Sequence, residues 1–130
     1  MSQACLLIVE ADILVRSPLS DYLRECGYRV VEAGNAVEAK ELLDDGSISI
    51  DVVLIDINGG DRTGFELAAW VRSNHAGCEV VLAGTPMKAA EKAGDLCEEG
   101  PALTTPYDHQ RVLDHIRRLI AARERDKSGI

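Results

Sequence analysis

The sequence predicts a single α/β domain in which five helices cover a doubly wound, five-stranded parallel sheet. Short aliphatic runs recur along the 130 residues, and amphipathic segments with helical spacing separate them. The runs at 5–9 and 52–56 are aliphatic without alternation, which is typical of strands buried on both faces of a parallel sheet. Right-handed crossovers between such strands produce a doubly wound sheet. We assign the domain to residues 1–122 and a polar tail to residues 123–130.

Five apolar runs are the predicted strands, and the segments between them are the predicted helices. The strands are CLLIV (5–9), RVVEA (29–33), VVLID (52–56), EVVLA (79–83) and a short ALT (102–104). The helical faces are formed by Leu19, Leu23 and Cys26, then by Ala36, Ala39 and Leu43, by Phe65, Ala68, Ala69 and Trp70, and by Val112, Ile116, Leu119 and Ile120. The fourth predicted helix, MKAAEKAGDLCEE (87–99), has little but alanine on its apolar face.

Single residues mark the expected ends of these helices. Gly27 ends the first helix, because glycine readily adopts the left-handed conformation that follows a helix. Asn35 is placed to cap the second helix through its side-chain oxygen. Ser17–Pro18 has the pattern of a cap followed by a proline in the first turn.

Charge and hydropathy exclude several classes of function. The net charge is −8, from 14 basic and 22 acidic residues. A chain this acidic repels a phosphate backbone, which argues against direct nucleic-acid binding. No stretch approaches the roughly 20 apolar residues of a membrane span, and the N-terminus lacks the basic lead and cleavage site of a signal peptide. We therefore expect a cytoplasmic protein that makes no contact with membranes.

The four cysteines predict neither a disulfide framework nor a zinc site. Cys5, Cys26, Cys78 and Cys97 are scattered and contain no C-x-x-C pair. Three of them lie in or beside apolar runs, where cysteine behaves as a small hydrophobic residue. The three histidines also lack the spacing of metal ligands.

Three acidic residues follow the first and third predicted strands. Glu10 and Asp12 come directly after the first strand, and Asp56 ends the third. In doubly wound sheets, ligands bind beyond the carboxyl ends of the strands. The sequence therefore places these acids at a candidate site. For Asp12 the structural alternative is the stronger one, since an acid at a helix N-terminus interacts favourably with the helix dipole.

Across about residues 4–122, the chain resembles the receiver domain of response regulators in two-component signalling, a flavodoxin-like fold. The segments that carry the resemblance are LLIVEAD, GYRVVEAGNAVEAKELL, VVLIDINGGDRTGFEL and TPYDHQRVLDHIRRLI. Asp56 stands at the phosphoacceptor position, Asn58 follows two residues later, and Gly64 matches the usual glycine of the following loop. The resemblance implies phosphoryl transfer from a phosphohistidine to Asp56 with the help of Mg²⁺, a lysine and a hydroxyl.

The residue-by-residue match implies a weakened site. Glu10, Asp56 and the carbonyl of Asn58 are the implied metal ligands, and Thr85 is the nearest substitute for the hydroxyl. Four positions depart from the family pattern, namely Ala11 for the second acid, Gly84 for the hydroxyl, Thr105 for the lysine and Ala102 for the switch aromatic. We therefore expect reduced Mg²⁺ affinity and slow acceptance of a phosphoryl group. Any catalysis would be limited to self-phosphorylation and autodephosphorylation at the aspartate.

Two further interpretations stay open at this stage. The chain can act as a phosphorylation-independent pseudo-receiver that binds a sensor histidine kinase or a phosphotransfer protein, or pairs with a second copy through its fourth and fifth helices. In that case Asp56 would merely cap the next loop. A flavodoxin-like small-molecule binder ranks lower, because ADILVRS after the first strand lacks a glycine-rich phosphate loop.

Overall fold

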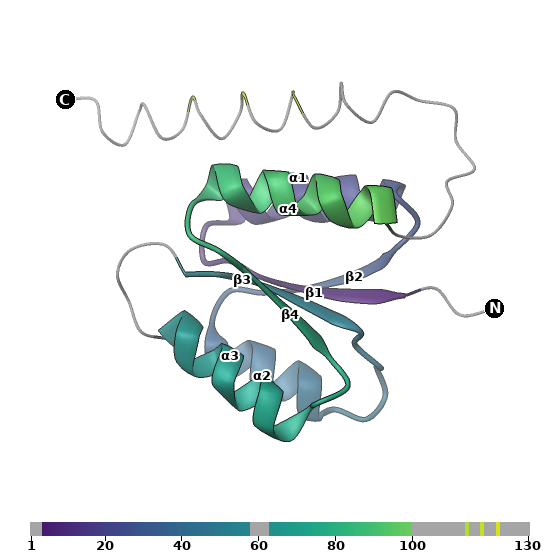
Figure 1. The fold of residues 1–130 in the computed structure, drawn as a ribbon, viewed down its shortest axis with the longest axis vertical. Coiled ribbons are helices and arrows are strands. Elements are labelled where there is room, and N and C mark those ends of the chain that lie inside the picture. Colours follow the sequence, from purple (N-terminus) through teal and green to yellow (C-terminus); the bar gives the residue numbers. More distant parts are fainter. Residues whose placement is uncertain (1–3, 58–62, 100–113, 115–117, 119–121, 123–130) are drawn as a thin grey trace.

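The computed structural model describes residues 4–57 and 63–99, together with single helical positions at 114, 118 and 122. Four strands and four helices alternate along the described ranges (Figure 1). The strands are β1 (Cys5–Val9), β2 (Arg29–Ala33), β3 (Val52–Asp56) and β4 (Glu79–Ala83). The helices are α1 (Ile13–Glu25), α2 (Ala36–Asp44), α3 (Thr63–Asn74) and α4 (Pro86–Glu99).

The four strands form one parallel sheet in the order β2-β1-β3-β4. In the register of the sheet, Leu7 pairs with Val31 of β2 on one side and with Val53 of β3 on the other. The predicted parallel sheet is therefore confirmed for its first four strands. The predicted fifth strand (102–104) and the apolar face of the predicted fifth helix lie outside the described residues.

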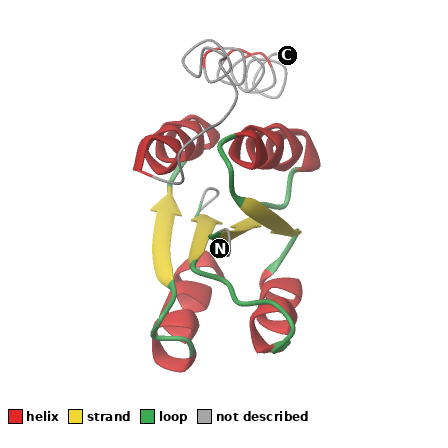
Figure 2. Cartoon of the chain, turned by 90° about the vertical axis from the view of Figure 1, so that its right-hand side faces the viewer, coloured by secondary structure: helices red, strands yellow, loops and turns green. Residues whose placement is uncertain are grey.

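Helices cover both faces of the sheet, with α1 and α4 on one face and α2 and α3 on the other (Figures 1 and 2). Each face has its own apolar core. Leu6 and Ile8 of β1 pack beneath α1 and α4, whereas Leu7 and Val9 pack against α2 and α3. Because all five residues of β1 are buried, the strand has no polar face and its sequence shows no alternation.

Helix α4 lies on the opposite face of the sheet from the one that a right-handed connection to a strand beside β4 would use. The crossovers through α1, α2 and α3 have the usual right-handed sense. A right-handed crossover that leaves β4 through the α1 face would lead back towards β2. A strand placed beyond the outer edge of β4 would instead require α4 on the α2 and α3 face.

Helix α1 begins earlier than the sequence pattern indicated. Asp12 is the N-cap, and its Oδ1 accepts a hydrogen bond of 3.0 Å from the backbone N–H of Leu14. The prediction that Ser17–Pro18 starts the helix was wrong, since Pro18 lies inside it. Because Asp12 lies five residues before the expected cap Ser17, it satisfies the first amide groups of a helix that is more than one turn longer than expected. The predicted stop at Gly27 is confirmed, with φ at 101°.

The caps and faces of the next two helices were predicted with unequal success. Asn35 caps α2 as expected, and its Oδ1 accepts a 2.9 Å bond from the N–H of Glu38. In α3 the predicted apolar face is confirmed at Ala68, whereas Phe65 points away from the core. Phe65 is 55% exposed, and the buried residues of the helix are Leu67, Ala68 and Val71.

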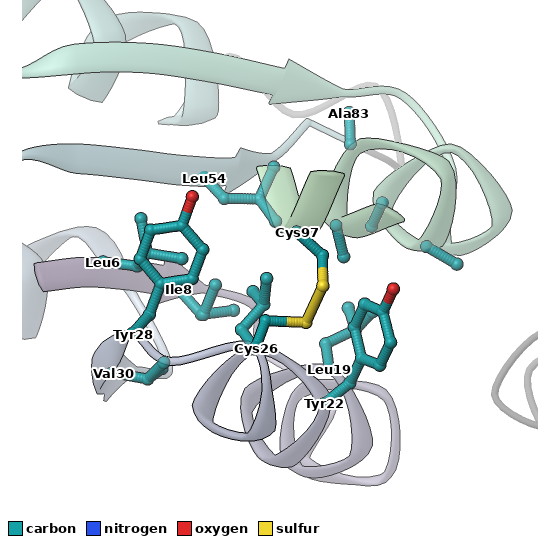
Figure 3. Close-up of a cluster of buried hydrophobic side chains, with 14 of the residues drawn as sticks. Leu6, Ile8, Leu19, Tyr22, Cys26, Tyr28, Val30, Leu54, Ala83 and Cys97 are labelled. Atoms are coloured by element: carbon teal, nitrogen blue, oxygen red, sulfur yellow. A yellow bond between two sulfur atoms is a disulfide. The ribbon is translucent and has the colours of Figure 1, made fainter. Parts of the chain in front are cut away.

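A disulfide bond joins α1 to α4, contrary to the sequence prediction (Figure 3). Cys26 and Cys97 lie 71 residues apart in sequence, and their Cα atoms are 5.4 Å apart. The spacing of the cysteines in the sequence does not indicate this pair, because only the fold brings the two helices together. Cys5 and Cys78 are free thiols.

No helix among the described residues is both long and apolar enough to serve as a membrane span.

Replacing Leu7 with alanine tests the importance of the central strand. The side chain is fully buried, so Leu7→Ala should lower the free energy of unfolding by about 2–5 kcal/mol through lost burial and a residual cavity. Urea denaturation followed by circular dichroism measures the loss. Val37→Ala is the matched control, because Val37 is 65% exposed and its truncation should change stability by less than about 0.5 kcal/mol. Equal effects of the two substitutions would contradict the assignment of the core.

Candidate functional site

The candidate site is a cavity of about 230 Å³ at the carboxyl edge of β1 and β3. Glu10 follows β1 directly and Asp56 is the last residue of β3, so the two parallel strands bring both carboxyl groups to this edge. The starts of α2 and α3 complete its walls. It is lined by Val9, Glu10, Ala11, Gly34, Asn35, Ala36, Ile55, Asp56, Ile57, Thr63, Gly64 and Leu67.

Glu10 and Asp56 interact directly at the floor of this cavity. Only 8% of Glu10 is exposed, and this burial is the largest cause that raises the pKa of Glu10 to about 8. A side-chain hydrogen bond to Asp56 and the negative charge of Asp56 raise it further. At neutral pH the Glu10 carboxyl group therefore holds a proton and donates it towards Asp56, because two adjacent carboxylates cannot both ionise at low cost.

Arg16 supports the backbone beneath this pair, a role that sequence reasoning missed. Its Nη1 donates a 2.7 Å hydrogen bond to the carbonyl oxygen of Glu10, and its Nε forms a 3.0 Å ion pair with Glu32 of β2. Arg16 thus holds the turn after β1 against β2. No motif marks this arginine in the sequence, since its partners come from two other elements.

Asp12 has the structural role that the sequence favoured. Its side chain caps α1, while its backbone N–H lies 3.4 Å from Oε1 of Glu10 and donates to it. The carboxyl group of Asp12 is therefore directed to the helix rather than to the cavity. Ala11 lines the cavity between these two acids, at the position where the resemblance implied a second metal-binding carboxylate.

Gly64 brings the start of α3 close to the end of β3. A Cβ atom at this position would lie 2.6 Å from Cγ2 of Ile57 and 3.1 Å from the carbonyl oxygen of Asp56. Distances this short require the neighbouring atoms to move. The glycine therefore permits the tight approach that closes the cavity beside Asp56.

Among the described residues, the predicted hydroxyl residue Thr85 does not join this group. The hydroxyl of Thr85 accepts a 3.0 Å hydrogen bond from the N–H of Lys88 and so caps the first turn of α4. Thr85 borders a separate groove of about 520 Å³ beside α4, and it is absent from the described lining of the acidic cavity. Asn58 lies outside the described residues, as do Ala102 and Thr105.

The two carboxyl groups are suited to a divalent cation. Mg²⁺ is commonly bound by one or two carboxylates and completes its octahedron with water. The raised pKa of Glu10 beside Asp56 marks a place where a second negative charge is unfavourable without a positive partner. The described part of the chain contains no group of three or more acidic, histidine or cysteine ligands, so waters would supply most of the remaining coordination.

The sequence of this chain is similar to those of several known proteins. A family model described as "Response regulator receiver domain" matches residues 6–117. The chain is 33% identical over 76 residues to a "Cyclic di-GMP phosphodiesterase" from Thermotoga maritima, which is 58% of this chain and 20% of that protein. It is 30% identical over 120 residues to a "Probable transcriptional regulator ycf29" from Pyropia yezoensis, covering 89% of this chain and 53% of the relative. The chain thus spans about a fifth to half of the length of these curated relatives.

The solved structures agree with this match at the level of the fold. A response regulator receiver domain protein from Methanospirillum hungatei superposes with a TM-score of 0.60 at 21% identity. The superposition covers 96% of this chain and 99% of the other.

The raised pKa of Glu10 predicts a pH-dependent stability in the absence of divalent ions. Between an unfolded value near 4.5 and a folded value of about 8, the folded protein binds more protons than the unfolded chain. The contribution of Glu10 is therefore complete below about pH 4.5 and is lost as the pH rises to 8, at up to roughly 1.4 kcal/mol per pH unit.

Urea denaturation in EDTA at several pH values measures this slope. Glu10→Gln should flatten it, because glutamine keeps a donor towards Asp56 but does not titrate. Glu66→Gln, an exposed change in α3, should leave the slope intact. Parallel slopes for the wild type and Glu10→Gln would show that Glu10 titrates normally.

Gly64→Ala tests the close approach beside Asp56. The added methyl group should lower the free energy of unfolding by about 1–3 kcal/mol and shift the amide NMR signals of Asp56 and Leu67. Gly77→Ala is the control, since a Cβ atom there would meet nothing within 4 Å. If both variants were as stable as the wild type, the approach of α3 to β3 would be looser than described.

Proposed function

This chain belongs to the response regulator receiver domain family of two-component signalling, and we propose that Asp56 is its phosphoacceptor. The supporting observation is the convergence of Asp56 and the buried Glu10 in one cavity at the carboxyl edge of the sheet. Glu10, Asp56 and the carbonyl of Asn58 are the proposed ligands of Mg²⁺. The metal would neutralise the negative charges of the carboxylates and of the approaching phosphoryl group.

The reaction requires a free oxygen on Asp56. An Oδ atom attacks the phosphorus of a phosphohistidine or of a small phosphodonor, the bond from phosphorus to the donor breaks, and an acyl phosphate forms on Asp56. The proton that Glu10 holds against Asp56 must leave before the cavity can accommodate further positive charge. Arg16, through the Glu10 carbonyl, keeps the turn after β1 in place during this exchange.

We propose that acceptance is slow, because the site lacks several groups that stabilise the transferring phosphoryl group. Ala11 supplies no carboxylate, Gly84 supplies no hydroxyl, and Thr85 is engaged as a helix cap. No lysine or arginine occurs among the described residues that line the cavity. Each missing charge-assisted contact is worth about 1.5–3 kcal/mol, which corresponds to a roughly ten- to hundredfold effect on the rate.

The proposed partners are a sensor histidine kinase or a phosphotransfer protein in the cytoplasm. The alternative function is that of a pseudo-receiver, which would bind such a partner, or a second copy through the fourth and fifth helices, without phosphorylation. The absence of basic residues from the described cavity lining favours this alternative. The direct approach of Glu10 to Asp56 favours the phosphoacceptor, because a merely structural aspartate does not require a second buried acid beside it.

Incubation with acetyl phosphate and Mg²⁺, followed by intact mass measurement, tests the proposal. The wild type should gain one phosphoryl group over minutes to hours, and Asp56→Asn should gain none. Asp21→Asn, a change on the exposed surface of α1, is the matched control and should react like the wild type. If the wild type stays unmodified at a saturating donor concentration, the proposal that Asp56 is a phosphoacceptor is wrong and the pseudo-receiver function remains. An adduct that persists in Asp56→Asn would place the modification elsewhere.

A further inference from the structure

Helix α4 is attached to the core by small side chains. Among its described side chains, the buried ones are those of Ala89, Ala90, Ala93 and Cys97, and the partly buried Leu96 is the one large side chain that packs beside them. The facing helix α1 buries Leu19, Tyr22 and Leu23. Because hydrophobic stabilisation scales with buried apolar area, α4 gains far less from packing than α1 does.

Two specific bonds near the C-terminal end of α4 compensate for its small buried apolar area. The disulfide joins Cys97 to Cys26, the C-cap residue of α1 (Figure 3). At the residue before Cys97, the carbonyl oxygen of Leu96 accepts a 2.6 Å hydrogen bond from the hydroxyl of Tyr28. The start of α4 is held separately by the Thr85 cap. The helix is thus fixed at both ends, and only the cross-link at its C-terminal end is covalent.

Helix α4 therefore depends on a few attachments, namely the disulfide and the Tyr28 hydrogen bond at its C-terminal end and the Thr85 cap at its start. Breaking the disulfide removes the covalent one, and we expect α4 to move more freely against α1 once it is broken.

We propose that the Cys26–Cys97 pair is a reversible redox site, and that a dithiol reductant of the thioredoxin class breaks the bond and releases α4 from α1. A thiolate of the reductant attacks the sulfur of Cys97, because Cys97 is the less deeply buried residue of the pair, at 7% exposed against 0% for Cys26. Cys26 leaves as a thiolate and is protonated. The second thiol of the reductant then displaces Cys97, so that two electrons and two protons pass to the pair and the reductant becomes a disulfide.

Reversibility follows from the cytoplasmic location proposed above, on which this inference rests. Disulfides in that compartment are usually transient and serve catalysis or redox sensing, because cellular thiols keep cysteines reduced. Phosphorylation of Asp56 is not needed for the redox step. The redox proposal can therefore be wrong while the phosphoacceptor proposal is right, and the reverse.

Thiol counting and hydrogen exchange on the full chain test the proposal. After equilibration with oxidised dithiothreitol, alkylation of the unfolded protein should modify two cysteines, Cys5 and Cys78, and peptide mapping should recover the 26–97 linkage. Treatment of the folded protein with thioredoxin and its reductase should raise the count to four. Amide exchange in α4 should then accelerate at least about tenfold, whereas exchange in β1 and β3 should stay unchanged.

Matched cysteine variants provide the controls. Cys97→Ser should show fast α4 exchange under both conditions, and Cys78→Ser should retain the redox response of the wild type. Circular dichroism and protection of β1 confirm that each variant is folded. The proposal would be overturned if four thiols were modified under oxidising conditions. It would also be overturned if reduction left the amide exchange rate of α4 unchanged. Loss of protection throughout the sheet on reduction would also overturn it, since the bond would then be a general staple of the fold.

Discussion

The burial of β1 on both faces is the constraint on which the rest of the structure depends. Its five residues are covered by helices above and below and pair with β2 and β3 on either side. Because β1 and β3 run parallel, the chain must leave both strands at the same edge of the sheet. Glu10 and Asp56 are the residues at these exits. The acidic cavity is therefore a direct product of the strand order, and any change that disturbs β1 disturbs the core and the site together.

The two adjacent carboxyl groups of the candidate site are unfavourable for the stability of the fold. A buried glutamate beside an aspartate costs free energy whenever both are ionised. The surrounding structure supports this arrangement through Arg16, which holds the Glu10 carbonyl, and through Gly64, which lets α3 approach Asp56. This local conflict is what the proposed cation site would require, because the positive charge that resolves it would come from outside the chain.

Much of the fold was predictable because strands and caps are encoded locally. The unbroken run Val52–Asp56 indicated a buried strand, and Asn35 indicated the start of α2. Contacts between distant elements were not predictable. Arg16 binds residues after β1 and in β2, and Cys97 meets Cys26 only because α4 packs on α1. The buried face of α3 was only partly predicted, because Phe65 and Trp70 were favoured over Leu67 and Val71, although Phe65 is 55% exposed.

Trp70 gives the molecule a built-in optical reporter. It is the only tryptophan of the chain, and it lies on α3, the helix whose first turn lines the acidic cavity. The Nζ of Lys40 on α2 lies 5.4 Å from the centre of the indole ring, and the ring of His75 lies 5.3 Å away. Indole emission depends on nearby charge, so its intensity registers the spacing between α2 and α3. A rearrangement that changes this spacing can thus be followed without attaching a dye.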